Sequence, residues 1–319
     1  MSIFDKRINY KPFEYPEVLT FTEAIQKAYW VHSEVDFTSD VQDYRANLDD
    51  VKREIHKRSI LSIAQIEVCV KNFWGDLYRY FPKPELNGLG ATFAESEFRH
   101  SEAYSRILEV NGYLDEFTVA LENPVFKSYN NFVTNILKDE EKSIVEKLLF
   151  FALVIEDSSL FSKFANILSF TRFEGLMKNT ANIIAWTSVD EQIHANAGIF
   201  LINKIKEEGL LPEDLDQNWV NTAVTGYIEQ EQLMLDWIFE KGELEHYSKE
   251  DLLNYMKYRL DEAIVKIGYQ KVFHISQDQY RPMAWFEEEV FANTLDDFFA
   301  KRPVDYTKHD KSISADDLF

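Results

Sequence analysis

Apolar residues recur along this chain at the spacing of helical turns, and no segment alternates strictly between apolar and polar residues as a half-buried strand does. The pattern therefore predicts an all-α fold. Glycine and proline number only 10 and 8 and gather near the ends of the apolar runs, which favours long helices. We predict helices over 47–80, from the end of a loop at 84–90 to 111, over 124–138, from Ser143 through Glu156, through Glu191 to about 208, over 213–241 and over 249–275.

The chain divides into three parts by composition. Residues 1–19 are expected to be extended, because Pro12 and Pro16 oppose a helix. Residues 20–290 carry the amphipathic runs without a linker, and we predict that they form one helical domain. Residues 291–319 hold too few apolar residues to pack alone and are expected to form a flexible tail. Its apolar end behind acidic residues is typical of a peptide that binds another protein.

Two Glu-x-x-His motifs lie in strongly helical segments. Glu97 and His100 form the first pair, and Glu191 and His194 form the second. A spacing of three residues places both side chains of a pair on one face of a helix, where a carboxylate and an imidazole can bind the same metal ion. One such motif is weak evidence in a chain rich in glutamate, whereas two copies in helices are a stronger signal.

Each motif is preceded by a glutamate in an apolar helical run, Glu67 before the first and Glu156 before the second. The order Glu…Glu-x-x-His, repeated once, is the known arrangement of ferritin-like dimetal carboxylate bundles. The alternative is that both single glutamates are solvated helix-face residues, but their apolar surroundings argue against it. A third motif, Glu243 to His246, lies in a polar stretch, and we expect it to be a surface feature.

The charges of these six residues match two divalent metal ions. Four glutamates carry about four negative charges, which two divalent ions neutralise, while neutral imidazoles add none. Without metal, four carboxylates that meet in an apolar bundle repel one another, and burial raises their pKa values. Oxygen ligands with a few imidazoles favour iron or manganese, and the lack of thiolates argues against structural zinc.

Composition excludes several other classes of protein. The formal net charge is −21 and no basic cluster is present, so a nucleic-acid surface is not expected. The longest apolar run, residues 148–155, is far shorter than a bilayer span, and residues 1–6 lack the apolar region of a signal peptide. The single cysteine, Cys69, cannot form an intramolecular disulfide and is interpreted as core packing. We therefore expect a soluble, cytoplasmic protein that binds no membrane.

Over nearly its whole length the chain resembles the small, radical-generating subunit of class I ribonucleotide reductase. Tyr104 stands four residues after the first motif histidine, where that family keeps its radical tyrosine. Asp190 directly precedes the second motif, as in the family's Asp-Glu-x-x-His. Trp30 begins a segment that matches the family's Trp-x-x-x-Glu-Val-Asp, and Tyr306 in the acidic tail completes the match.

The resemblance implies a fold and a reaction. It implies a ferritin-like helical bundle with additional helices, whose metal ligands are Glu67, Glu97, His100, Glu156, Glu191 and His194. It implies that an oxidising equivalent, made from an oxygen species and held on the metals or on Tyr104, passes to a cysteine of the large subunit, where ribonucleotides are reduced to deoxyribonucleotides. The residues implied in this path are His100, Asp190, Trp30 and Tyr306. It also implies a homodimer and a large-subunit contact made by the tail.

Departures from the family pattern bear on the oxidant. The first ligand is commonly aspartate, but here it is Glu67, and Lys71 projects from the same helix face four residues later. The positions matched to the apolar pocket of the radical tyrosine hold Leu160, Phe164 and Thr187. The last of these adds a hydroxyl, and a more polar pocket protects a tyrosyl radical less well. We therefore expect a manganese centre, dimanganese first and manganese–iron second, with diiron and a Tyr104 radical third.

Two rival functions remain. A ferritin-like dimetal oxidase or monooxygenase acting on a lipid or hydrocarbon uses the same six ligands, but it does not need Trp30, Asp190 and Tyr306 together. A ferritin-like iron store is the non-enzymatic interpretation, but ferritins are much shorter than 319 residues. Removal of the tail distinguishes these functions, because only an enzyme that works with a large subunit depends on it.

Overall fold

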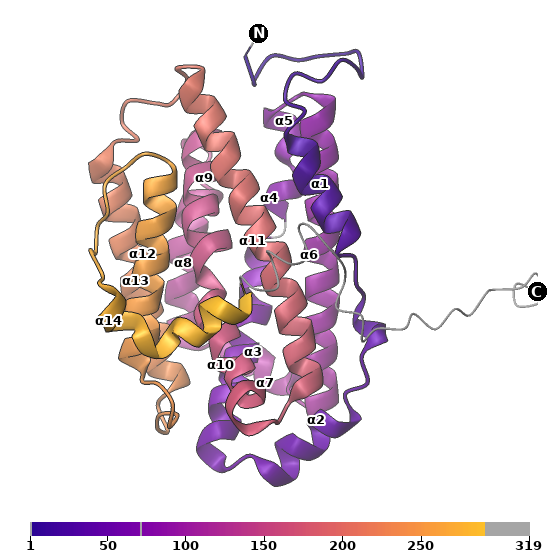
Figure 1. The fold of residues 1–319 in the computed structure, drawn as a ribbon, viewed down its shortest axis with the longest axis vertical. Helices are drawn as coiled ribbons and strands as arrows, with labels where there is room; N and C mark the ends of the chain where they lie inside the picture. Colours follow the sequence, from indigo (N-terminus) through magenta and orange to yellow (C-terminus); the bar gives the residue numbers. More distant parts are fainter. Residues whose placement is uncertain (1, 71, 291–319) are drawn as a thin grey trace, which may run out of the picture.

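The computed structural model describes residues 2–70 and 72–290 (Figure 1). Within these ranges the protein is helical and holds no β-strand, which confirms the predicted all-α fold. In chain order the elements are α1 (Val18–Lys27), η1 (His32–Glu34), α2 (Thr38–Gln42), η2 (Asp43–Asn47), α3 (Asp50–Val70), α4 (Asn72–Gly75), α5 (Leu77–Tyr80), α6 (Pro84–Asn111), α7 (Leu114–Leu121), α8 (Pro124–Leu137), α9 (Ile144–Phe150), η3 (Phe151–Ser159), α10 (Phe161–Glu174), α11 (Lys178–Glu207), α12 (Gln217–Ile238), α13 (Lys249–Lys266), α14 (Gln277–Tyr280) and η4 (Arg281–Met283).

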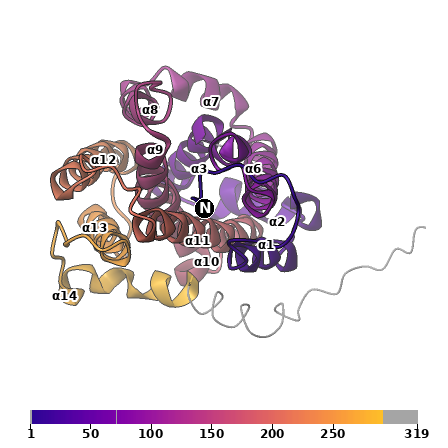
Figure 2. The same cartoon turned by 90° about the horizontal axis from the view of Figure 1, so that it is seen from above.

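Four helical segments surround the centre of the bundle. They are α3, α6, α11 and the continuous run α9–η3–α10, in which α11 packs along η3 and α10 while α3 packs along α6 and α10. Seen from above, α3, α6 and α11 lie around the middle, α12 and α13 cover one side, and α1 and α2 cover another (Figure 2). The expected bundle with additional helices is therefore present.

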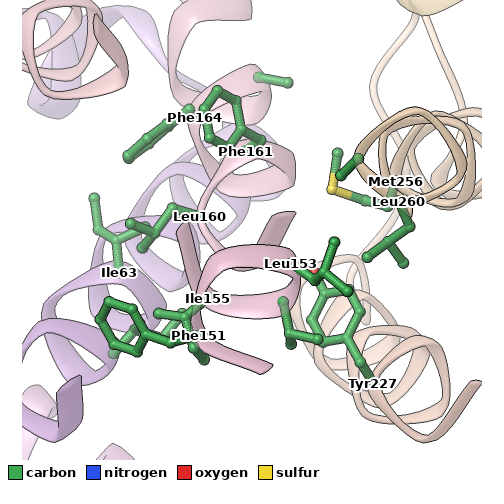
Figure 3. Close-up of a cluster of buried hydrophobic side chains, with 14 of the residues drawn as sticks. Ile63, Phe151, Leu153, Ile155, Leu160, Phe161, Phe164, Tyr227, Met256 and Leu260 are labelled. Atoms are coloured by element: carbon green, nitrogen blue, oxygen red, sulfur yellow. The ribbon is translucent and has the colours of Figure 1, made fainter. Parts of the chain in front are cut away.

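The segment η3 is a π-helix, and every one of its residues is buried. Its side chains spread in two directions (Figure 3): Phe151 and Ile155 lie on the side of Ile63 from α3, while Leu153 lies beside Tyr227 from α12. A Cβ added at Gly198 of α11 would stand 2.6 Å from the Cβ of Ala152, so these two elements approach too closely for a side chain there. The wider π turn was not predicted, because hydrophobic periodicity does not distinguish it from an α-helix.

The predicted loop over 84–90 is wrong, because α6 begins at Pro84. Proline is compatible with the first helical turn, where its missing N–H has no partner to lose. Gly90 is explained by packing instead of by a turn: a Cβ there would stand 2.6 Å from the carbonyl oxygen of Trp74. The end of this helix is as predicted, since Gly112 caps it with a φ of 76°.

Other helix boundaries differ in detail from the predicted ones. The described residues of the predicted helical region 47–80 form α3, α4 and α5, and Asp76 is a turn residue between α4 and α5. The helices predicted over 213–241 and 249–275 are shorter, and α13 ends before Gly268, which has a φ of 82°. Ser143 is confirmed as the residue that opens α9, because its hydroxyl accepts a hydrogen bond of 3.1 Å from the Glu146 amide. The tail 291–319, with Tyr306, lies outside the described residues.

A fully buried ion pair joins α10 of the central run to α12, which covers it. Lys163 of α10 donates hydrogen bonds to the carboxylate of Glu231 on α12 and, at 3.0 Å, to the carbonyl oxygen of Ser159. Ser162 donates to the other oxygen of Glu231. Burial lowers the pKa of Lys163, and Glu231 opposes this effect. The contact with Glu231 therefore favours the charged form of Lys163, which burial alone disfavours.

We expect Glu231→Ala to lower the free energy of unfolding by about 3–5 kcal/mol, because it leaves a buried ammonium group without a charged partner. The double variant Lys163→Met/Glu231→Leu removes both charges and should recover most of that loss. Urea unfolding of the full chain measures both values. An equal loss in the single and the double variant would contradict the stated cause.

Candidate metal centre

The structure brings the six predicted side chains together in the middle of the bundle. Glu67 comes from α3, Glu156 comes from η3, and the two motifs come from α6 and α11. They form two groups of four residues within which one ligand atom per residue lies within 4.8 Å of the others. The first group is Glu67, Glu97, His100 and Glu191, and the second is Glu97, Glu156, Glu191 and His194. All six residues are buried.

The two groups share Glu97 and Glu191, which places these carboxylates between the two histidines. Nδ1 of His100 lies 2.9 Å from Glu191 Oε1 and 3.4 Å from Glu97 Oε2. Nδ1 of His194 lies 3.0 Å from Glu97 Oε1 and 3.4 Å from Glu191 Oε2. Each histidine therefore faces one oxygen of each shared carboxylate. This arrangement has the form of two adjacent cation sites bridged by two carboxylates.

Several of these buried atoms lack a hydrogen bond within the described part of the chain. They are both oxygens of Glu67, Oε1 of Glu191, and the Nδ1 atoms of His100 and His194. Buried polar atoms without partners are rare in proteins unless a water or an ion satisfies them. Carboxylate oxygens and imidazole nitrogens are the donors that iron and manganese prefer. The residues present therefore fit a pair of divalent metal ions.

In each ligand group a neighbouring residue contacts the second ring nitrogen of the histidine and fixes the orientation of the ring. Nε2 of His100 lies 3.1 Å from Asp190 Oδ2, and Nε2 of His194 lies 2.9 Å from the hydroxyl of Ser96. These contacts leave both Nδ1 atoms directed at the carboxylates, as is usual for histidines that bind metals. Trp74 donates a hydrogen bond of 2.6 Å from its indole N–H to Glu156 Oε1.

Without metal, the pKa is raised for two of the four carboxyl groups and lowered for the other two. Burial raises the pKa of Glu67 well above its usual range, and the negative charge of Glu97 adds to the effect. Burial likewise raises the pKa of Glu156, and Glu191 adds to it. Burial acts in the same direction on Glu191, but its close contacts with Glu156 and both histidines outweigh burial and hold the pKa of Glu191 well below the usual value. A similar balance lowers the pKa of Glu97.

The two histidines carry the compensating charge. Burial alone lowers the pKa of His100, but contacts with Asp190 and the motif carboxylates outweigh it and raise the pKa well above the usual value. His194 shows the same direction, with burial again opposed by the surrounding carboxylates. The metal-free cluster thus balances its charge with protons, and divalent ions must displace those protons in order to bind.

Tyr104 lies one turn beyond His100 on α6 and is buried, and its hydroxyl has no hydrogen-bond partner among the described residues. Burial raises the pKa of Tyr104 well above its usual value, the charges of Glu67 and Glu191 add to this, and the neighbouring Thr187 hydroxyl opposes it. Thr187 donates its own hydrogen to the carbonyl oxygen of Ile183, at 3.0 Å. The other two residues of the predicted pocket, Leu160 and Phe164, are also buried.

A chain of contacts leads from the cluster to Trp30. The indole N–H of Trp30 donates a hydrogen bond of 3.0 Å to Asp190 Oδ2, the same oxygen that contacts His100. The rings of Trp30 and His100 are stacked, with centroids 5.8 Å apart and an interplanar angle of 12°. These contacts connect Trp30, His100 and Asp190, which lie far apart in the sequence. Tyr306, Lys71 and the side chain of Cys69 lie outside what the structure describes.

The third Glu-x-x-His motif is exposed, as predicted. Glu243 and His246 both face solvent, and the imidazole stacks on Phe173 with centroids 4.1 Å apart.

Three residues that contact the cluster or its neighbours were not predicted from the sequence: Ser96, Trp74 and Arg99. Ser96 and Arg99 lie within the first motif segment, so proximity in sequence was a signal for them. Trp74 of α4 follows Glu67 by seven residues, but its contact is with Glu156 of η3 and so depends on the tertiary fold.

No helix in residues 2–70 and 72–290 is long and apolar enough to cross a membrane. The helical bundle and its paired carboxylate–histidine groups define a ferritin-like protein with the residues of a dimetal carboxylate site. A family model described as "Ribonucleotide reductase, small chain" matches residues 7–282. The chain therefore belongs to the family of ribonucleotide reductase small chains, and it is an oxidoreductase subunit. The comparisons give no support to the alternative of a lipid or hydrocarbon oxidase.

Curated relatives and solved structures agree with this assignment. A probable ribonucleoside-diphosphate reductase small subunit of Invertebrate iridescent virus 6 is 27% identical, over 96% of this chain and 95% of the relative. The ribonucleoside-diphosphate reductase small subunit of Dictyostelium discoideum is 23% identical, over 93% of this chain and 85% of the relative. The structure of the ribonucleotide reductase R2 subunit from Clostridium botulinum has a TM-score of 0.79 at 18% identity and covers 89% of this chain and 91% of its own. The dimanganese(II)-NrdF structure from Streptococcus sanguinis has a TM-score of 0.74 at 16% identity and covers 90% and 100%.

Proposed function

We propose that Glu67, Glu97, His100, Glu156, Glu191 and His194 are the ligands of two metal ions, and that this centre makes and stores the oxidising equivalent for ribonucleotide reduction. The chemistry that a bound metal pair supplies here is one-electron oxidising power obtained from an oxygen species. The observation that carries the proposal is the pair of ligand groups that share two carboxylates and join directly, through His100, to Asp190 and Trp30.

The protein's own residues move the oxidising equivalent out of the bundle. Trp30 loses one electron toward the centre, and its Nε1 proton moves to Asp190 Oδ2, which already accepts the hydrogen bond. A neutral indole radical remains, because one electron and one proton have left together. Asp190 also holds His100 in place, so one carboxylate couples the ligand to the carrier. We propose that Tyr306 then carries the equivalent to a cysteine of the large subunit.

For the metals we favour two manganese ions, with manganese–iron second and diiron with a Tyr104 radical third. The oxygen-rich ligand set supports manganese or iron, and the Thr187 hydroxyl near Tyr104 supports a centre that does not rely on a tyrosyl radical. A solved structure of the same fold, that of the Streptococcus sanguinis protein, is a dimanganese(II) form. In this scheme Tyr104 is a buried neighbour of the centre and need not be oxidised.

Metal analysis with low-temperature electron paramagnetic resonance tests the choice of oxidant on the full chain activated in air. We expect about two manganese ions per chain and a multiline signal from coupled metals. Two irons with a sharp organic radical signal that is lost in Tyr104→Phe would overturn the manganese choice while keeping the six ligands. Failure to retain either metal at any loading would overturn the ligand assignment itself.

The tail is proposed to dock on the large subunit. Its acidic stretch and apolar end, Leu318 and Phe319, support this function, because short motifs of this kind bind partner proteins. We expect deletion of residues 306–319 to abolish deoxyribonucleotide formation with the large subunit, since both Tyr306 and the docking end are lost. Metal content and the paramagnetic signal of the isolated chain should not change. Full turnover by the truncated chain would contradict the proposal.

Two further properties belong to the same proposal. We expect a homodimer, which is supported by the Rnr4 homodimer structure from Saccharomyces cerevisiae, with a TM-score of 0.72 at 14% identity. We also propose a cytoplasmic location. The single cysteine supports it, because a chain without an intramolecular disulfide suits a reducing compartment.

A further inference from the structure

Arg99 stands on α6 between the residues of the first motif, and only 4% of its surface is exposed. Its Nη1 donates a hydrogen bond of 3.2 Å to the carbonyl oxygen of Trp30 and lies 3.6 Å from Asp190 Oδ2. Its Nε donates a hydrogen bond of 3.0 Å to Glu95, whose side chain is partly exposed. One guanidinium group therefore touches two of the residues that are proposed to move the oxidising equivalent.

The same guanidinium lies against two aromatic rings. Its central carbon is 5.3 Å from the ring centroid of Trp30 and 4.7 Å from that of Tyr29, which is 48% exposed. Its Nη2 has no hydrogen-bond partner among the described residues. An arginine buried mainly for packing would pair all its donors, because unpaired buried N–H groups are costly. This arginine is held by the hydrogen bonds of its Nε and Nη1 and by the contacts of its planar face.

A cation against an aromatic face has a definite electrostatic effect. The neutral ring attracts the cation through its quadrupole, so the contact stabilises reduced Trp30. A ring that has lost an electron and kept its proton is itself positive and is repelled by the same cation. The nearby carboxylates are Glu95, which is partly exposed, and Asp190, which is shared with Trp30 and His100. Arg99 thus raises the energy of a positively charged Trp30 more than that of a neutral one.

We propose that Arg99 is a positioning residue that fixes Trp30 against Asp190 and, through its charge, holds back oxidation of Trp30. The consequence is that the oxidising equivalent stays at the centre until electron and proton leave Trp30 together. The electron that fills the stored hole comes from Trp30, and the Nε1 proton goes to Asp190, so no further reactant is needed. This inference rests on the proposed function, because it assigns Arg99 a part in the path through Trp30.

The positioning part is tested without metal, on the full chain labelled with ¹⁵N-tryptophan. The indole N–H resonance of Trp30 is identified by its loss in Trp30→Phe, and its exchange with solvent is measured. We expect exchange in Arg99→Met to be about tenfold faster, as the loss of a contact of this size allows. Arg99→Lys should also exchange faster, because lysine lacks the planar fork that reaches Trp30 and Asp190. Unchanged exchange in both variants would overturn the positioning role.

The charge part is tested on the metal-loaded small subunit without its large subunit. We expect the half-life of the oxidised centre to be about tenfold shorter in Arg99→Met, because the barrier to oxidation of Trp30 falls with the lost cation. Arg99→Lys keeps the charge and should restore most of the half-life, a pattern that a packing defect does not give. A lysine variant as short-lived as the methionine variant, or a methionine variant as long-lived as the unaltered protein, would overturn the charge role.

Failure of this inference is distinguishable from failure of the proposed function. In the Trp30→Phe background, Arg99→Met should no longer shorten the half-life, because the residue on which Arg99 acts is gone. A persistent shortening there would show that Arg99 acts elsewhere and overturn the inference alone. Full turnover of Trp30→Phe with the large subunit would instead overturn the proposed path, while the exchange result on the metal-free chain would still test the placement of Trp30.

Discussion

Replacement of Glu97 by alanine is expected to remove both metal ions and, with them, more than about 99.9% of ribonucleotide reduction, the size of loss seen when an essential catalytic group is removed. The reason is geometric: Glu97 belongs to both ligand groups, and each of its oxygens faces a different histidine. Loss of a residue that serves one site, such as Glu67, should weaken that site more than the other. Metal content per chain and the rise in melting temperature on addition of manganese measure the effect, because binding to the folded state stabilises it.

The chain contains its own control for this substitution. Glu243 and His246 have the same residue types at the same spacing, but both are exposed and the imidazole stacks on Phe173. Glu243→Ala should therefore keep the metal content, the stabilisation by manganese and the turnover of the unaltered protein. Retention of two metal ions by Glu97→Ala, or their loss in Glu243→Ala, would show that burial among the bundle helices does not select the site.

The six candidate ligands could be placed from the sequence because helical spacing is a local property. The two side chains of a Glu-x-x-His motif lie on one face of a helix whatever surrounds it. An apolar run around a lone glutamate indicates that the glutamate is buried. Asp190 and Trp30 were found differently, through the resemblance to a family. Nothing in their local sequence shows that Trp30 and Asp190 share a hydrogen bond across 160 residues of chain.

The features that sequence did not reveal depend on contacts between helices. The loop predicted at 84–90 failed because Gly90 is required by the carbonyl of Trp74, a reason that only tertiary packing supplies. The π-helix η3, which carries Glu156, has the same hydrophobic pattern as an α-helix. Helical spacing does not distinguish Arg99 from an exposed residue, because the rings that it contacts, Tyr29 and Trp30, come from the segment that follows α1.

Replacement of Asp190 by asparagine should leave the metal centre assembled but lower turnover with the large subunit by about 10²- to 10⁴-fold, the usual effect of removing an acid–base group. Asparagine keeps the shape and can still accept the indole hydrogen bond, but it cannot take up the Nε1 proton of Trp30. Its single oxygen can take the place of Asp190 Oδ2, which contacts both Trp30 and His100, so the variant removes the proton acceptor and not the contacts. Metal content and the paramagnetic signal show assembly, and deoxyribonucleotide formation shows turnover.

Trp30→Phe should give a loss at least as large, because phenylalanine has neither the N–H nor an accessible oxidation step. Trp219→Phe is its matched control: Trp219 also donates its indole N–H to a carboxylate, Glu146, at 2.9 Å, but it lies on α12 outside the cluster. If both tryptophan variants lose turnover equally, the effect arises from lost packing and the path through Trp30 is wrong. If only Trp30→Phe and Asp190→Asn lose turnover while their metal signals persist, the oxidising equivalent is made but cannot leave, which is the behaviour that the shared hydrogen bonds at Asp190 require.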